Sequence, residues 1–253
     1  MASLLARLLG TLFLLSLFVV ATTWWRRDAL PPPDVYDLAS LKAPRQQATD
    51  RRPFEVEAGD QRYRIEPLFD YVLEGVVVSY HDADSLADIW HHGSWQDFLN
   101  VRDLCVIWGD NVRSAVYHDM HFRNDSWTCW AYWPDAQTGA RFRMDQLSNN
   151  HLLTDDPRVK RALMAARPGD HVRLTGMLAS YRNPGNGFSR GTSVSRDDRG
   201  NGACETIYVT DFEVVSEANA GVRGLHAGAR WIAGLSLAGF LVAFVVAPVR
   251  AIR

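Results

Sequence analysis

The chain has 253 residues, a formal net charge of −2 at pH 7 and a sequence pI near 6.4. Domains that bind nucleic acid usually carry a strongly basic face, so this charge balance excludes nucleic acid as a predicted partner. The three cysteines lack Cys-x-x-Cys spacing, which excludes a zinc ribbon and a thioredoxin-like site.

Two long apolar segments lie near the ends of the chain. Residues 8–25 and 231–249 contain no charged side chain. Each is about long enough to cross a ~30 Å hydrocarbon core as a helix, which takes roughly 20 residues. We therefore predict a transmembrane signal anchor at residues 1–27 and a transmembrane helix with a short tail at residues 231–253.

The predicted membrane topology follows from the number of spans. Two spans place both termini on one side of the bilayer and the intervening region on the other. The short start with Arg7 is typical of a signal anchor whose amino terminus stays inside. We predict a bacterial inner-membrane protein whose domain lies in the periplasm. A signal peptide cleaved near Ala21 is the alternative.

The first half of the domain contains several predicted elements. Residues 28–53 are polar and interrupted by prolines, which predicts an extended linker. Residues 54–67 alternate apolar and polar residues around Ala-Gly-Asp, which predicts a hairpin. Further strands are predicted at residues 73–80, 102–108 and 126–133, with a helix at residues 82–91.

The second half contains a helix with clear start signals. Asp156 can cap it, Pro157 suits its first turn, and Arg-Pro-Gly at residues 167–169 ends it. Strands are predicted at residues 171–181 and 206–215, the latter with a bulge near Asp211. Residues 216–230 are small and polar, which predicts a flexible linker to the second span.

Three strands, a helix and two strands form the element order of the OB-fold. We predict a mainly β protein: an OB-like five-stranded barrel with one or two helices at residues 54–215, flanked by two transmembrane helices. The segments GDHVRLTGML and ETIYVTDFEVV resemble the fourth and last OB strands. With LEGVVVSY, DLCVIWGDN, SWTCWAYWP, LSNNHLL, RPGDHVRLTG and GNGACETIYV, they also resemble uncharacterised bacterial membrane-anchored proteins. OB-fold topology implies a binding role, and the family resemblance carries no assigned activity.

The cysteines predict one disulfide in an oxidising compartment. In an OB barrel the third strand neighbours the second and the fifth, so Cys129 could pair with Cys105 or Cys204. We favour Cys129–Cys204, because a bond there would fasten the glycine-rich loop that precedes Cys204. Three buried thiols are the alternative.

Histidines suggest two kinds of chemistry. His118 and His121 form an HxxH that would share one face of a helix and could bind a metal. The surrounding pattern favours a loop that leads into a strand, so no metal or other cofactor is predicted. A catalytic nucleophile and base could come from Ser148 or Cys129 together with His151 and Asp145. We favour a structural role for these residues, because such side chains also form hydrogen bonds with loop backbone groups near helix starts.

The segment between the last two strands is the predicted ligand-binding loop. It places Arg190, Arg196 and Arg199 among glycines, serines and threonines, which could surround an anion. Trp127, Trp130 and Trp133 fall on both faces of the strand predicted at residues 126–133. Core packing is favoured for them, and stacking on a sugar or base by the second face is the alternative.

The sequence therefore predicts a membrane-anchored extracytoplasmic binding protein without catalysis, whose partner is another envelope protein, a peptide or a glycan. Two alternatives stay open. One is a membrane-anchored hydrolase or metal-dependent enzyme. The other is a structural subunit whose small residues, Gly234, Ser236, Ala238 and Gly239, pack within a membrane complex.

Overall fold

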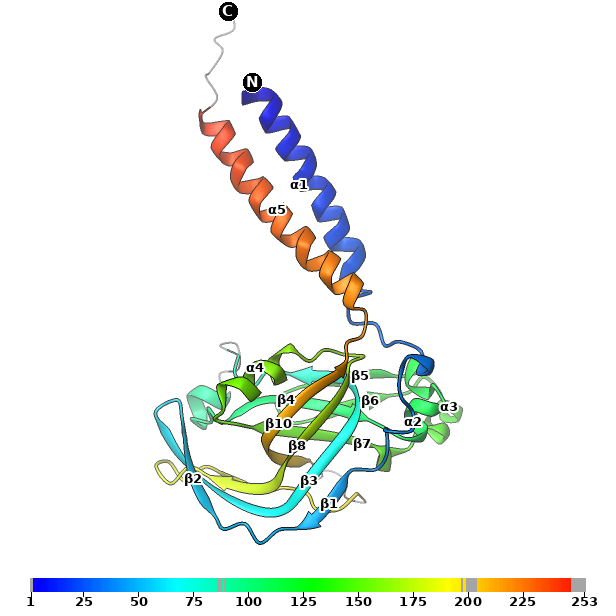
Figure 1. The fold of residues 1–253 in the computed structure, drawn as a ribbon, viewed down its shortest axis with the longest axis vertical. Coiled ribbons are helices and arrows are strands. Elements are labelled where there is room, and N and C mark those ends of the chain that lie inside the picture. Colours follow the sequence, from blue (N-terminus) through cyan, green and yellow to red (C-terminus); the bar gives the residue numbers. More distant parts are fainter. Residues whose placement is uncertain (1, 86–87, 89, 197, 199–203, 247–253) are drawn as a thin grey trace, which may run out of the picture. The chain divides into compact units, whose positions relative to one another are not determined.

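The structure is a computed structural model that describes residues 2–85, 88, 90–196, 198 and 204–246. It is a mixed fold with a large, mainly β sheet and several helices (Figure 1). Leu30–Ala218 forms one compact unit, and the described residues on either side of it form another.

The elements follow one another in this order. They are α1 (Ala2–Trp24), a 3₁₀ turn (Pro33–Val35), β1 (Arg45–Ala48), β2 (Phe54–Ala58), β3 (Gln61–His81), a π-helical turn (Trp90–Ser94), β4 (Asn100–Ile107), α2 (Asp110–Arg113), a 3₁₀ turn (Val116–Asp119), β5 (His121–Asn124), β6 (Cys129–Tyr132), α3 (Ala136–Arg141), a 3₁₀ turn (Met144–Gln146), β7 (Leu147–Leu153), α4 (Pro157–Ala165), β8 (His171–Arg182), β9 (Ser189–Arg190), β10 (Glu205–Ser216) and α5 (Ala220–Val246).

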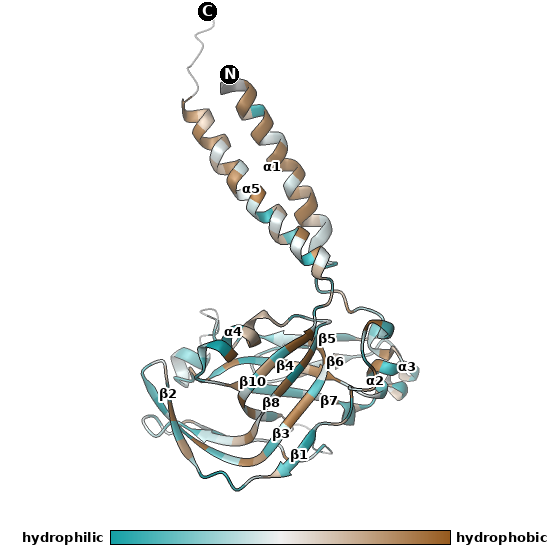
Figure 2. Ribbon diagram, in the orientation of Figure 1, coloured by the Kyte–Doolittle hydropathy of each residue, from teal (hydrophilic) through white to brown (hydrophobic). Residues whose placement is uncertain are grey.

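The first unit contains the two apolar helices, α1 and α5. Both are long and apolar enough to cross a membrane (Figure 2). They pack antiparallel, with the Gly10 backbone next to the Phe240 ring. A Cβ at Gly239 would lie 3.2 Å from Leu9, so this glycine faces α1. Ser236 is also buried, whereas Gly234 has open space around it.

Helix α5 begins earlier than the sequence suggested. The region 216–230, predicted as a flexible linker, is helical from Ala220 onward. The other predicted linker, 28–53, also differs from expectation. Tyr36 and Leu41 are buried in the main core, and β1 pairs with β3, so much of this segment belongs to the β unit. Burial of these two apolar side chains holds the segment against the β unit, although prolines interrupt it.

The predicted hairpin at residues 54–67 is confirmed. Strands β2 and β3 pair antiparallel, and the two-residue turn of Gly59 and Asp60 has positive φ at both positions. This turn geometry matches the twist of the strands it joins. Strand β3 then continues to His81 and becomes the longest strand that the structure describes.

Five strands form the centre of the eight-stranded sheet. Strand β3 pairs with β4, β4 with β7, β7 with β10, and β10 with β8, while β8 also pairs with β3. The β7–β10 pair is parallel and the other four pairs are antiparallel. Strands β1, β2 and β9 extend this arrangement.

Several local predictions in the second half are confirmed. The Asp156 side chain accepts the backbone N–H of Arg158 at the start of α4, and Pro157 occupies its first turn. Strand β10 has a register shift between Val209 and Asp211. Gly176 lies mid-strand in β8, where a Cβ would collide with the carbonyl oxygen of Tyr208.

The prediction for the third strand is wrong. The third central strand is β7, whereas residues 129–132 form β6 of a separate two-stranded sheet with β5. Polar side chains cover much of β7 and are buried. Ser148, Asn149, Asn150 and His151 are all 6% exposed or less. A strand that is buried on both faces lacks the apolar and polar alternation on which the prediction relied.

Two further predictions also differ. The helix expected at residues 82–91 does not appear among its described residues before Trp90, where a single π-helical turn begins; residues 86–87 and 89 lie outside the described part. Trp127, Trp130 and Trp133 are 44%, 42% and 46% exposed, so they do not fill the core. Trp108 is the fully buried tryptophan, 1% exposed.

Candidate active site

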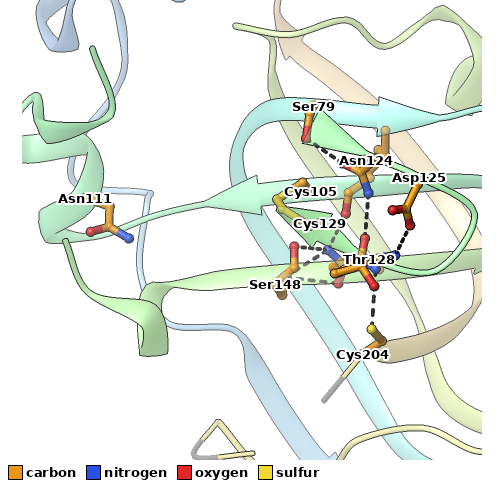
Figure 3. The surroundings of a disulfide bond; sticks show 12 residues. Ser79, Cys105, Asn111, Asn124, Asp125, Thr128, Cys129, Ser148 and Cys204 are labelled. Carbon is orange, nitrogen blue, oxygen red and sulfur yellow. Dashed lines mark hydrogen bonds between the residues drawn. A yellow bond between two sulfur atoms is a disulfide. The ribbon is translucent and has the colours of Figure 1, made fainter. Parts of the chain in front are cut away.

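The disulfide joins a central strand to the small sheet. Cys105 of β4 is bonded to Cys129 of β6, and Cys204 is free. Figure 3 shows this bond between the two strands, with Cys204 apart from it at the start of β10. The predicted Cys129–Cys204 pairing is therefore wrong. It assumed that Cys129 lies on the third central strand, but β7 occupies that place and the β5–β6 sheet packs next to Cys105.

The free thiol lies at the edge of a polar cluster. The Cys204 Sγ accepts a hydrogen bond from Asn149 Nδ2 at 3.4 Å and donates to the Trp127 carbonyl oxygen at 3.6 Å. The His151 imidazole is a further neighbour of the thiol and acts on its pKa. Cys204 is partly exposed, whereas His151 is completely buried.

A carboxylate holds the other side of this imidazole. His151 Nδ1 lies 2.7 Å from Asp103 Oδ1, and both side chains are fully buried. The two residues are direct cross-strand partners of β4 and β7. Asp103 also accepts a hydrogen bond of 3.0 Å from Asn100 Nδ2. Cys204, His151 and Asp103 thus bring a thiol, an imidazole and a carboxylate together, and we call them the Cys204–His151–Asp103 series.

Strand register explains why these residues meet. Alternate residues of a strand point to one face of the sheet. Asp103 opposes His151, and Thr206 of the parallel β10 also opposes His151. Cys204 stands two residues before Thr206, so its side chain lies on the face that carries His151. Cys105 shares this face as well, which is the face that the β5–β6 sheet covers.

The electrostatics of the series favour a reactive thiol. Burial raises the pKa of Cys204, but the neighbouring His151 imidazole, with contributions from Asn149 and Arg190, brings it below its ordinary value. Burial lowers the pKa of His151, and the charge and hydrogen bond of Asp103 outweigh that effect and raise it. Burial raises the pKa of Asp103, but His151 draws it below its ordinary value.

Arg190 completes the surroundings of the imidazole. Its Nη2 lies 2.5 Å from His151 Nε2, and its guanidinium lies over the Trp127 ring at 5.0 Å. A guanidinium only donates hydrogen bonds, so Nε2 accepts this one and the imidazole carries its proton on Nδ1, toward Asp103. Arg190 Nη1 is buried and has no hydrogen-bond partner in the part of the chain that the structure describes.

The catalytic residues considered from the sequence are only partly brought together. His151 belongs to the cluster, but Ser148 points to the other face of β7 and donates to Asn150 Oδ1. Asp145 lies in the turn before β7 and binds the Arg143 guanidinium at 2.9 Å. The carboxylate at His151 is Asp103, and the thiol next to this cluster is Cys204. Asp103 and Cys204 could have been identified only from the strand pairing that brings them next to His151, and the sequence does not contain that pairing.

His118 and His121, the alternative metal ligands, do not share one face of a helix. His118 lies in a 3₁₀ turn, His121 begins β5, and both side chains are exposed. This agrees with the expected loop that leads into a strand.

Two arginines of the predicted ligand-binding loop contact buried side chains. Arg190 binds His151, and Arg196 pairs with the buried carboxylate of Glu205. Arg199 lies outside the described residues. Ligand binding by these arginines stays a prediction, and Arg190 is the one that the structure places in the cluster.

An aromatic surface adjoins the cluster. The rings of Trp95 and Trp127 lie 4.2 Å apart, and Trp90 stacks on Trp95 at 6.3 Å. On β6, Trp130 and Tyr132 are stacked at 6.3 Å and exposed. Trp130 and Tyr132 give the exposed side of β6 an aromatic character.

Comparison with known proteins gives no match: no family model, curated protein or solved structure is significantly similar to this chain.

Proposed function

We propose that this chain is a membrane-anchored thiol-dependent hydrolase or acyltransferase of the bacterial envelope, with Cys204 as its nucleophile. The observation that carries the proposal is the Cys204–His151–Asp103 series, in which a buried carboxylate orients an imidazole next to a partly exposed thiol of lowered pKa. Nucleophilic catalysis requires a nucleophile, a base within hydrogen-bond reach and a group that orients the base.

Each residue then has a definite role. His151 Nε2 takes the proton of Cys204, and the thiolate attacks the carbonyl carbon of an ester, thioester or amide. The tetrahedral intermediate collapses to a thioester on Sγ as the leaving group takes the proton from His151. Water, deprotonated by His151, releases the acid and restores the thiol. Asp103 keeps the Nδ1 proton in place throughout.

Arg190 has to leave His151 Nε2 for this reaction, because that atom must accept the proton. A carboxylate or phosphate on the substrate would draw the guanidinium away, and the unpartnered Nη1 is available to it. The predicted anion-binding role of Arg190 thereby becomes substrate recognition.

The fold and the location belong to the same proposal. The pairing of β3, β4, β7, β10 and β8, the parallel β7–β10 pair, and the position of α4 between β7 and β8 support an OB-like barrel. The two apolar helices and Arg7 support an inner-membrane protein with a periplasmic domain, where a disulfide such as Cys105–Cys129 persists.

The test uses the full-length protein in detergent and p-nitrophenyl acetate as the acyl donor. We expect a burst of nitrophenolate, one acetyl group per chain mapped to Cys204 by mass spectrometry, and slower turnover. Cys204→Ala should lose both the burst and the label, and Ser148→Ala should keep them. Acetylation elsewhere, or none faster than that of an unfolded control, would contradict the proposal.

A binding function is the second candidate, and the aromatic surface favours it. Exposed, stacked Trp130 and Tyr132 are suited to stack on a sugar ring or a peptide side chain. If this candidate holds, Trp130→Ala should abolish binding of the glycan or peptide partner, and Cys204→Ala should leave that binding unchanged. The opposite result would favour the enzyme.

A further inference from the structure

A second cluster lies where β3 ends. His81 is the last residue of β3, and Asp88 and His91 follow in the connection to β4. His81 Nε2 lies 2.6 Å from Asp88 Oδ2, and His91 Nδ1 lies 2.8 Å from the same oxygen. The three atoms lie within 4.8 Å of one another. Two imidazole nitrogens thus converge on one carboxylate oxygen.

The environment of the cluster has the form of a ligand site. Asp88 is 5% exposed and His91 is 0% exposed, while the His81 side chain is 23% exposed. A cation bound among them would be enclosed by protein on the Asp88 and His91 sides. It could keep a water molecule or an added ligand on the His81 side, where the cluster is open to solvent.

Surrounding groups hold the carboxylate in place. The Oδ1 atom of Asp88 accepts the backbone N–H groups of Trp90 and His91, each at 3.1 Å. This leaves Oδ2 for the imidazoles, with the Ser126 hydroxyl at 3.4 Å. The Trp95 ring packs edge-on against His91 at 5.0 Å. Metal ligands are usually oriented by such outer contacts.

We propose that His81, Asp88 and His91 bind one divalent transition-metal cation, with Zn²⁺ as the best fit. Two imidazoles and a carboxylate form a three-residue donor set that Zn²⁺ accepts in tetrahedral geometry, with a fourth position left for water. The cation takes the place of the two ring protons that otherwise point to Asp88 Oδ2. The proposal does not rest on the proposed thiol chemistry at Cys204.

Asn100 connects the metal cluster to the thiol site. Coordination through His91 Nδ1 leaves a proton on Nε2, which lies 3.4 Å from Asn100 Nδ2. The Asn100 Oδ1 is buried without a hydrogen-bond partner in the described residues, so the amide has to turn this oxygen toward Nε2. The turn withdraws Nδ2 from Asp103, so we expect metal binding to alter the alkylation rate of Cys204.

The experiment measures metal binding by the full-length protein in detergent. The protein is stripped with EDTA, dialysed and titrated with Zn²⁺, and with Co²⁺ to record the visible spectrum. We expect one ion per chain and the visible bands of tetrahedral Co²⁺. His81→Ala should weaken Zn²⁺ binding at least about tenfold. The double variant His118→Ala/His121→Ala is the matched control and should bind as the wild type does.

A folding control keeps the result interpretable. The His81 side chain lies at the exposed edge of the cluster, so His81→Ala should keep the circular dichroism of the wild type. Should it unfold, His81→Gln replaces it as the test variant. Wild-type protein that binds no Zn²⁺, or binding that survives His81 replacement, would overturn the proposal. Acetylation of Cys204 in EDTA tests the proposed enzyme separately.

Discussion

His151→Ala is expected to slow the acetylation of Cys204 by p-nitrophenyl acetate by about 10²–10⁴-fold, the range over which a positioned general base contributes. The imidazole is the proposed base of the thiol and a main cause of its lowered pKa. Burst kinetics and intact-mass spectra of the full-length protein measure the rate.

Asp103→Asn tests the same series from its other end. The carboxylate accepts the Nδ1 proton at 2.7 Å and so leaves Nε2 free of a proton. An amide in its place can donate to Nδ1 and favour the unproductive tautomer, so we expect a large loss here too. Asp145→Asn is the matched control, because that carboxylate is exposed and pairs with Arg143. Equal rates for Asp103→Asn and Asp145→Asn would contradict the assigned roles.

Arg102→Ala is expected to destabilise the β unit by about 1.5–3 kcal/mol, the typical contribution of a hydrogen bond to a charged group. The Arg102 side chain is fully buried and lies over the Tyr80 ring at 3.9 Å. Its Nε binds Asp82 at 2.9 Å, and its Nη1 donates to the Leu163 carbonyl oxygen at 2.7 Å. The truncation removes this charged donor from the Leu163 carbonyl oxygen, which still accepts the backbone N–H of Ala166.

Urea unfolding of the full-length protein in detergent, followed by tryptophan fluorescence, measures this loss. Arg113→Ala is the control, because Arg113 forms an exposed pair with Asp110 that contributes about 0–1 kcal/mol. Equal midpoints for the two variants would show that Arg102 is not part of the stabilising network.

The elements with strong local signals could be predicted from the sequence. The Asp156 cap and Pro157 defined the start of α4, and Gly59 with Asp60 defined the β2–β3 turn. These features act over a few residues, so composition and spacing suffice. The apolar runs at both ends predicted the two long helices for the same reason.

Strand β7 could not be predicted, and this error affected the site. Asn149 and Asn150 are polar residues, which in the sequence indicate a loop. In the structure they are buried in a strand, where they donate hydrogen bonds to the Trp127 and Leu104 carbonyl oxygens. With the third strand placed at residues 126–133, Cys129 appeared to neighbour Cys204. The partnership of His151 with Asp103 depends on cross-strand register, which spacing along the chain does not contain.

The pH dependence of Cys204 alkylation tests the central claim most directly. The unreduced full-length protein is treated with iodoacetamide across the pH range, and the labelled residue is mapped by mass spectrometry. Because the thiolate is the reacting form, the rate follows its titration. We predict labelling of Cys204 alone, with a pKa below the ordinary thiol value of 9.0 that rises in His151→Ala. A pKa at or above 9.0 in the wild type, or labelling of Cys105 or Cys129, would contradict an activated Cys204 nucleophile.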